Sequence, residues 1–315
     1  MLPFHKLGTR PGEFEEIIVG EEFGPETYVV DDHMVKAFAF AQDDLDPWTF
    51  SDENPFGKRV AQAACLANDL LWIFMTEFDP NTVIGLHTQE ELWFHRPAYV
   101  GEEVSVTGRY VDKYQKRGKG CCDLHAEVVG EDGTRIMTHH GVEIMRVLGT
   151  QLGEKKAAPI EGDKVTGEYD DTIPEISKAS ADVAPGTPLT PLVKQTTNAQ
   201  TMVFSNCEMF FESIHADIKV AKKSGYDGLI VQGQQQVCYI IEMMRYFFGE
   251  SWYTSGYLKV KMIKPVVAGD KLTFRAVVKE KTTEDGHTKL HLHVWGRNSK
   301  GEMTTIGWCS AFAEA

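Results

Sequence analysis

The stretch FHRPAYVGE at residues 94–102 has a counterpart, MIKPVVAGD, at residues 262–270. Both stretches carry a proline, three further residues, then glycine and an acidic residue, and they lie 168 residues apart. The same offset relates a later turn glycine, Gly133, to Gly301. A Pro-x-x-x-Gly-acid turn and a following hairpin turn that recur at one offset predict two tandem copies of one fold.

Each copy is predicted to contain one apolar helix followed by strands. The helices cover residues 60–78 and 234–248, and most of their circumference is apolar, as in a buried helix. The strands alternate apolar and polar residues at 104–111, 121–129 and 135–147 in the first copy and at 257–263, 271–279, 289–295 and 304–312 in the second. This pattern suits antiparallel pairing, so we expect an α+β fold in which one continuous sheet, or two abutting sheets, wraps both central helices.

A segment of different composition separates the copies. Residues 149–191 are rich in proline, glycine and charged side chains and show no sustained helical or strand period. We therefore predict a first domain at residues 1–148, a linker at 149–191 and a second domain at 192–315.

The composition is that of a globular protein, with 42% hydrophobic and 25% charged residues in a chain of 315. The 46 acidic and 32 basic residues give a formal net charge of −14, which argues against a nucleic-acid partner. The sequence shows neither a signal-peptide run nor an apolar stretch of membrane length, so we expect a cytoplasmic protein without a membrane partner. In that compartment the six cysteines, which include no Cys-x-x-Cys pair, are expected to be reduced thiols.

The residues before the second helix carry the candidate chemistry. They read FFESIHAD at 210–217 and GYDGLIVQG at 225–233. His215 suits acid–base work because its ordinary pKa of about 6.5 lies near working pH. The backbone N–H of Gly233, at a helix start, can stabilise an oxyanion, and glycine lets a ligand approach closely. Hydration of a 2-enoyl thioester requires both functions.

These two stretches resemble the hydratase motif of the MaoC-like, (R)-specific enoyl-CoA hydratase and 3-hydroxyacyl-CoA dehydratase family. In that motif Gly-Asp-x-Asn-Pro-[Ile/Leu]-His-x-Asp precedes a short helix and a glycine-bearing turn into the long helix. The stretch KPVVAGD at 264–270 matches a further turn of the family, and the two-copy length is that of its double hot-dog members. The resemblance implies a tandem double hot-dog fold, with His215 as catalytic acid or base and the Gly233 amide as oxyanion donor.

The first copy reads DLDPWT at 44–49 and FGKRVA at 56–61, and it resembles the N-terminal hot dog of the same family. Thr49 occupies the histidine position, and the resemblance implies that this copy has lost its chemistry and completes the acyl-CoA tunnel. Asp44 keeps the family's aspartate position, but we expect it to belong to the pseudo-equivalent site, too far away to help His215.

The second copy departs from the family pattern at its carboxylate. The family's aspartate, five residues before the histidine, is Phe210 here, its asparagine is Glu212, and the histidine before the helix glycine is Gln232. We predict that Glu212 replaces the catalytic carboxylate, since it lies three residues from His215 on a loop. Phe210, Phe211 and Gln232 are the candidate substrate-binding residues, and the departures suggest a branched, dicarboxylic or aromatic acyl group.

Structural roles are the alternatives for several of these residues. His215 could be a hydrogen-bonded structural histidine, Glu212 a solvated carboxylate, and Gln232 a buried amide. Three aspartates are expected to be helix N-caps: Asp44, Asp46 and Asp217.

Evidence for a metal or cofactor site is weak. His291 and His293 share a strand face, but no third ligand follows at a fixed spacing, and His139 and His140 face opposite ways. The sequence has no dinucleotide turn, Walker loop or nucleophile elbow, so we expect no metal and no cofactor other than the coenzyme A of the substrate. Six lysines near the proposed site could meet CoA phosphates or form a solvated face: Lys219, Lys222, Lys223, Lys259, Lys261 and Lys264.

We therefore predict an enzyme, a carbon–oxygen lyase that hydrates an enoyl-CoA or dehydrates a 3-hydroxyacyl-CoA, with an acyl-CoA thioester as its partner. A hot-dog thioesterase that uses Glu212 and a non-catalytic acyl-CoA-binding protein are the alternatives. The sequence leaves open whether copies of the chain form a homo-oligomer.

Overall fold

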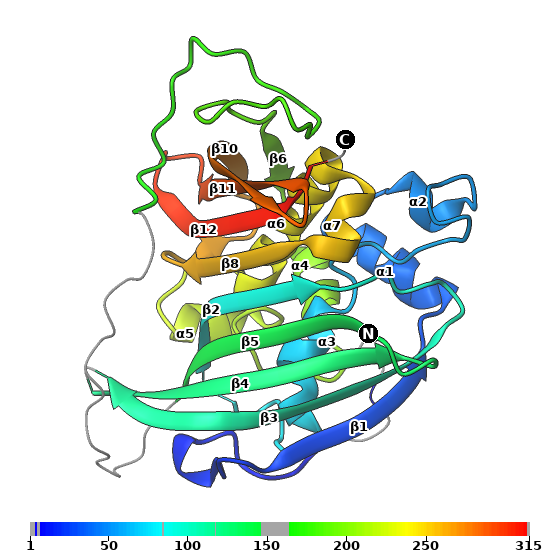
Figure 1. The fold of residues 1–315 in the computed structure, drawn as a ribbon. Coiled ribbons are helices and arrows are strands. Elements are labelled where there is room, and N and C mark those ends of the chain that lie inside the picture. The colour runs from blue at the N-terminus through cyan, green and yellow to red at the C-terminus, as the bar shows by residue number, and fades with distance from the viewer. Residues whose placement is uncertain (1–3, 5–6, 84, 117, 146–163, 314–315) are drawn as a thin grey trace.

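The computed structural model describes residues 4, 7–83, 85–116, 118–145 and 164–313 (Figure 1). Within these residues, ten strands pair antiparallel in one sheet, in the order β1-β3-β4-β5-β2-β8-β12-β11-β10-β6. The first copy supplies β1 (Glu22–Val29), β2 (Gly85–Phe94), β3 (Glu103–Lys116), β4 (Lys119–Gly130) and β5 (Arg135–Met145). The second supplies β6 (Leu192–Gln195), β8 (Tyr257–Met262), β10 (Lys271–Glu284), β11 (His287–Arg297) and β12 (Met303–Phe312). A separate ribbon pairs β7 (Ile230–Val231) with β9 (Val266–Val267).

Equivalent strands of the two copies begin 168 residues apart. Strands β3, β4 and β5 start at residues 103, 119 and 135, and β10, β11 and β12 start at 271, 287 and 303. The turns before β3 and β10 contain Gly101 and Gly269, whose φ angles of 96° and 94° lie in the region that favours glycine. The repeat predicted from the sequence is therefore a structural repeat.

The copies join where β2 pairs with β8, at the centre of the sheet. Leu92 pairs with Leu258, and Glu91 pairs with Lys259, whose Nζ lies 2.5 Å from the Glu91 carboxylate. The sheet is thus continuous across both copies, and it curves around the central helices (Figure 1). The predicted α+β arrangement is confirmed, and of its two alternatives the structure has one continuous sheet.

Helix α6 (Gly233–Phe248) is the central helix of the second copy, as predicted for residues 234–248. Its aliphatic and phenylalanine side chains are buried, with Val237, Ile240 and Met244 at 0% exposure, whereas Tyr246 is exposed. The helix ends at Gly249, whose φ of 61° suits glycine.

The central helix of the first copy is shorter than predicted. Helix α3 (Ala67–Trp72) continues as the 3-10 helix η2 (Ile73–Thr76), and residues 60–66 are not helical. Val60 instead forms a β-bridge with Tyr99, and the Ala61 N–H donates to the Ala98 carbonyl at 2.9 Å. Because this bridge uses the backbone groups that a helix would need, the predicted start at residue 60 is wrong.

The remaining helices are short: η1 (Phe14–Glu16), α1 (Asp32–Gln42), α2 (Pro47–Phe50), α4 (Asn198–Phe204), α5 (Ile218–Lys223) and α7 (Glu250–Ser255). Asp46 and Asp217 cap α2 and α5 as predicted, and their side chains accept a backbone N–H of the first turn at 3.1 and 2.6 Å. The same prediction for Asp44 is wrong, because this side chain is buried near the Arg245 guanidinium and caps no helix.

The segment between the copies is only partly described. Residues 149–163 of the predicted linker, and the end of the strand predicted at 135–147, lie outside the described residues. Farther along, Pro188 bridges to Val277, and the Gly186 N–H donates to the Val278 carbonyl at 2.7 Å. Leu189 is 2% exposed. This part of the chain therefore packs against β10.

All six cysteines are free thiols, and five of them are buried, which agrees with the expected reduced state. Among the described residues, no helix is both long enough and apolar enough to span a membrane.

Candidate active site

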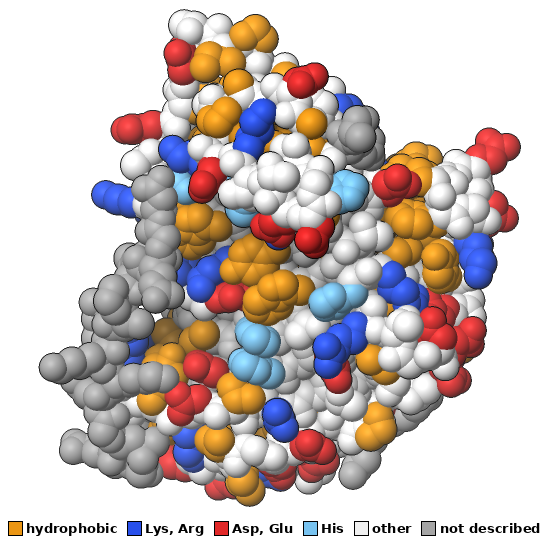
Figure 2. All heavy atoms as spheres, viewed as in Figure 1, with side chains coloured by type: hydrophobic (Ala, Val, Ile, Leu, Met, Phe, Trp, Pro, Cys, Tyr) orange, Lys and Arg blue, Asp and Glu red, His pale blue; other side chains and the backbone are white. Residues whose placement is uncertain are grey.

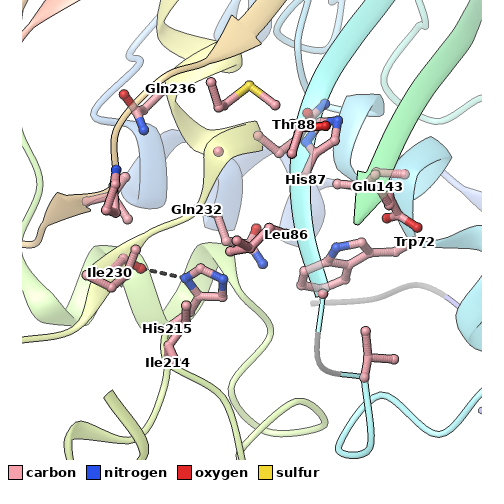
Figure 3. Close-up of a pocket in the computed structure, with 18 of the residues that line it drawn as sticks. Trp72, Leu86, His87, Thr88, Glu143, Ile214, His215, Ile230, Gln232 and Gln236 are labelled. Atoms are coloured by element: carbon pink, nitrogen blue, oxygen red, sulfur yellow. Dashed lines mark hydrogen bonds between the residues drawn. The ribbon is translucent and has the colours of Figure 1, made fainter. Parts of the chain in front are cut away.

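A cavity of about 230 Å³ lies where the two copies meet, beside the start of α6 (Figure 3). From the second copy it is lined by His215, Gln232 and Gly233, together with Phe210. From the first copy it is lined by apolar side chains of α3 and η2, among them Leu71, Trp72, Phe74 and Met75. The second copy therefore supplies the motif residues, and the first copy supplies an apolar wall with a polar end at His87, Thr88 and Glu143.

The His215 side chain is held as a neutral imidazole. Its Nδ1 lies 2.6 Å from the Ile230 carbonyl, and because a carbonyl only accepts, Nδ1 carries the hydrogen and Nε2 keeps a lone pair (Figure 3). Burial lowers the pKa of His215 to about 4, against a smaller opposing effect of the Ile230 hydrogen bond. The acceptor is itself fixed, since Ile230 pairs with Val267 and donates its N–H to Ile214.

Gly233 is the first residue of α6, on the wall of the same cavity. The first N–H groups of a helix have no intrahelical acceptor, and Gln232 provides no side-chain cap for them. A Cβ at position 233 would lie 3.1 Å from the Met262 Cγ, so glycine leaves room beside the amide. The helix start therefore offers N–H donors to an anionic oxygen in the cavity.

The loop before His215 divides its side chains between the cavity and the surface. Phe210 lines the cavity and contacts the Trp72 ring edge-on at a centroid distance of 5.8 Å. Phe211 and Glu212 are exposed and do not line the cavity, because their backbone N–H groups are both held by the Asn81 Oδ1, at 3.1 and 3.0 Å. The structure thus gathers Phe210, His215, Gln232 and Gly233, and it places the predicted Phe211 and Glu212 outside.

The equivalent position in the first copy is closed. Its cavity, between Phe94 and Tyr253, measures only about 10 Å³. Beside it, the Arg245 Nε lies 3.2 Å from the Asp46 Oδ2, and the Arg245 Nη2 lies 3.9 Å from Asp44. Burial raises the pKa of Asp44 to about 6 although Arg245 opposes the shift. This site is therefore occupied by the protein's own charges, and Thr49 is fully buried.

The geometry can be compared with known proteins. Residues 17–146 match a family model described as "FAS1-like, dehydratase domain region". No curated protein matches the sequence. Among solved structures, a MaoC-like dehydratase has a TM-score of 0.70 at 16% identity, with 94% of this chain and 98% of that chain covered. A Mycobacterium tuberculosis protein described as having a double hotdog fold has a TM-score of 0.67 at 13% identity, with 96% of this chain and 98% of that chain covered. A MaoC-like dehydratase from Phytophthora capsici has a TM-score of 0.65 at 13% identity, with 94% of this chain and 96% of that chain covered.

The chain has the double hot-dog fold of the MaoC-like dehydratases. The predicted fold class and the predicted resemblance are thereby confirmed. The matched family model describes a dehydratase region and covers the first hot dog, whereas the motif histidine lies in the second. The family match and the fold together support an enzyme of the hydratase or dehydratase class.

A group of buried polar residues that the sequence did not indicate lies at the first-copy end of the cavity. Glu90 is 0% exposed, and its Oε2 accepts from the Nε2 of His87 at 2.9 Å and of His139 at 3.0 Å. Burial alone would raise the pKa of Glu90, but the two histidines lower it below its usual value. Among the described residues these three are also the group whose ligand atoms lie within 4.8 Å of one another, a spacing that a metal ion could share, although their mutual hydrogen bonds account for the arrangement without one.

The sequence spacing hid this group. In a regular strand, residues three apart face opposite ways, so His87 and Glu90 would not meet. The pairing of β2 with β5 shifts between His87 and Gln89, and this β-bulge turns both side chains to the inner face.

The adjacent histidines His139 and His140 face opposite ways, as predicted. His139 is buried, whereas His140 stacks on His125 on the outer face of the sheet with ring centroids 3.5 Å apart. Figure 2 shows histidines gathered with hydrophobic side chains on that face. His291 is bonded to Thr282 at 2.9 Å and belongs to no group of three metal-ligand residues in the described chain.

Only one of the six lysines lines the cavity. Lys264 does so, and it is also paired with Glu302. Lys259 is paired with Glu91, and Lys261 lies over the Trp308 ring at 5.6 Å. Three others lie on α5: Lys219, Lys222 and Lys223.

Proposed function

We propose that the chain catalyses reversible addition of water to a 2-enoyl-CoA, or equivalently dehydration of a 3-hydroxyacyl-CoA. One observation carries this proposal: a histidine with an unprotonated Nε2 lines the same cavity as the free N–H groups of a helix start. Among the described residues of the second copy, no other histidine lines this cavity. The first element is a base, and the second is an oxyanion site.

The thioester carbonyl accepts the Gly233 N–H, which polarises the double bond. His215 Nε2 then takes a proton from water while the water oxygen bonds to C3, and the electron pair of the double bond moves to form an enolate whose oxygen stays on the Gly233 amide. The imidazolium returns its proton to C2, which restores the neutral histidine. A buried imidazolium with a low pKa is a strong acid, so this return is favoured.

The acyl group is proposed to lie against α3 and η2 of the first hot dog. Leu71, Trp72 and Met75 provide an apolar surface for it, and Phe210 closes the wall where the family motif has its aspartate. This arrangement supports a branched or aromatic acyl group. We propose no cofactor other than the coenzyme A of the substrate, and we propose that Lys264, which lines the cavity, contacts CoA.

The thioesterase alternative relied on Glu212 as the carboxylate that directs water. With that side chain exposed and outside the cavity, the structure offers no observation in its favour.

The test is a panel of straight, branched and aromatic 2-enoyl-CoA and 3-hydroxyacyl-CoA thioesters, with hydrated product and free thiol quantified in the same reaction. We expect interconversion of enoyl and hydroxyacyl thioesters without thiol release. Thiol release without hydration would establish a thioesterase, and binding without either product would establish an acyl-CoA-binding protein.

A further inference from the structure

The end of the cavity that lies in the first hot dog is polar, although the rest of its wall is mostly apolar. His87 and Thr88 of β2 and Glu143 of β5 line this end, as Figure 3 shows on the side away from His215. His87 pairs directly with Glu143 across the two strands. None of the three takes part in the proposed hydration.

This polar end is held from behind by buried partners. The Tyr110 hydroxyl, at 0% exposure, donates to the Glu143 Oε2 at 3.0 Å. His87 is fixed on Glu90, and the Gln234 amide at the start of α6 donates to the other oxygen of Glu90 at 3.3 Å. Removing such polar groups from water costs free energy unless they are hydrogen-bonded, and here each of these side chains has such a partner. The same hydrogen bonds connect the polar end of the cavity to the start of α6.

The polar end lies close to the reaction centre. A Cβ at Gly233 would be 3.7 Å from the His87 carbonyl oxygen, so β2 runs directly past the helix start at this residue. A thioester bound at the Gly233 amide would therefore extend its acyl chain, beyond the reacting carbons, along β2 toward Glu143.

The charges at this end disfavour an anionic chain end. Two carboxyl groups, Glu90 and Glu143, lie here with two histidines. Burial opposes a charge on His87, but the hydrogen bond to Glu90 raises the pKa of this imidazole, and any positive charge on it is matched by Glu90 and not left for a further carboxylate. Burial raises the pKa of Glu143 despite the opposing effect of His87, so a larger fraction of this group is neutral and able to donate a hydrogen bond.

The geometry points to a recognition site in which Glu143 and the buried Nδ1 of His87, which has no hydrogen-bond partner among the described residues, hydrogen-bond a hydroxyl group carried by the acyl chain beyond C3. This inference rests on the proposed function for the identity of the thioester, and it names the substrate class of the same cavity.

The experiment measures equilibrium binding, which does not depend on turnover. Saturated thioesters that cannot be hydrated are compared by calorimetry: hexanoyl-CoA, its 4-, 5- and 6-hydroxy derivatives, and adipoyl-CoA. With wild-type protein we expect one hydroxylated chain to bind about tenfold more tightly than hexanoyl-CoA, the value of one or two neutral hydrogen bonds. Adipoyl-CoA is expected to bind more weakly than that chain.

Two variants at one position test the assignment. Glu143→Met removes both oxygens at similar length, and its binding ratio of hydroxylated to plain chain should fall to about one. Glu143→Gln keeps an acceptor for the Tyr110 hydroxyl and a donor toward the chain, and it should retain part of the preference. Thermal unfolding of both variants establishes that they are folded.

The inference is overturned if hexanoyl-CoA binds as tightly as every hydroxylated chain, if adipoyl-CoA binds most tightly, if no acyl-CoA binds, or if folded Glu143→Met keeps the wild-type ratio. Hydration of enoyl-CoA without any preference for an oxygenated chain overturns the inference alone. A clear preference without hydration overturns the proposed function alone.

Discussion

Replacing Gly233 with proline tests the oxyanion site at the start of α6. Proline lacks the backbone N–H, and the first position of a helix tolerates it because that N–H has no intrahelical partner. The preceding residue, Gln232, already has φ −58° and ψ 144°, which is the extended conformation that a following proline requires. The helix should therefore form with the donor removed.

The expected loss is that of one preorganised donor. Removing one such donor lowers kcat by about 10²- to 10³-fold, or about 2.7–4 kcal/mol, and we expect Gly233→Pro to lose this factor. The added Cβ would lie 3.1 Å from the Met262 Cγ and 3.6 Å from its Cε, contacts that a flexible methionine can relieve. Gly233→Ala adds the same Cβ and keeps the N–H, so it is the matched control.

The assay is the initial rate of 2-enoyl-CoA hydration, followed through the loss of the conjugated thioester absorbance, with thermal unfolding measured in parallel. We expect Gly233→Ala to remain much more active than Gly233→Pro. If Gly233→Pro is folded and as active as Gly233→Ala, the Gly233 amide is not the oxyanion donor.

Three further outcomes are expected. Burial lowers the pKa of His215 to about 4, so the imidazole stays unprotonated and kcat/KM should be constant down to about pH 5 and fall only toward pH 4. A fall in kcat/KM centred near the ordinary histidine pKa of about 6.5 would contradict this. Arg245→Met leaves the fully buried Asp46 without its ion pair, so denaturant unfolding should show a loss of about 3–5 kcal/mol of stability. Turnover per folded molecule should be unchanged, and an unaltered unfolding midpoint would refute a role for this pair. Trp72→Ala removes a ring from the cavity wall and should cost about 3–5 kcal/mol of stability. It should also raise kcat/KM for long acyl groups relative to short ones, and an unchanged ratio of these two kcat/KM values would argue against this wall as the acyl surface.

The fold could be predicted largely because its repeat is marked by local signals. A turn that places glycine at a φ near 95° has few alternatives, so Gly101 and Gly269 fix equivalent points in both copies. The alternation of each strand and the apolar surface of α6 are likewise properties of short segments. The continuous joining of β2 to β8 depends on contacts between the copies, and the sequence left that choice open.

Prediction and structure differ where distant contacts decide the conformation. The helix predicted from residue 60 is lost because Val60 bridges to Tyr99, almost 40 residues later. Glu212 had a plausible spacing from His215, yet a hydrogen bond to Asn81, 131 residues earlier, holds the loop so that Glu212 lies at the surface.

His87 was missed for a related reason. Its contact with Glu90 depends on a bulge in β2, and strand alternation without that bulge places the two side chains on opposite faces. His215 and Gly233 could be predicted as candidates because the motif lies in two short stretches of the chain, and the structure brings both residues to one cavity. The first-copy wall of the cavity could not be found in this way, because it is assembled from the other half of the protein.

The central claim is that His215, without Glu212, is the acid–base group of the cavity. The most direct measurement is kcat for hydration of one enoyl-CoA by wild type, His215→Ala and Glu212→Gln, with all three shown to be folded. We expect His215→Ala to lose about 10²- to 10⁴-fold, the usual contribution of a general acid–base, and Glu212→Gln to keep wild-type activity. Full activity in His215→Ala, or collapse in Glu212→Gln, would contradict the account.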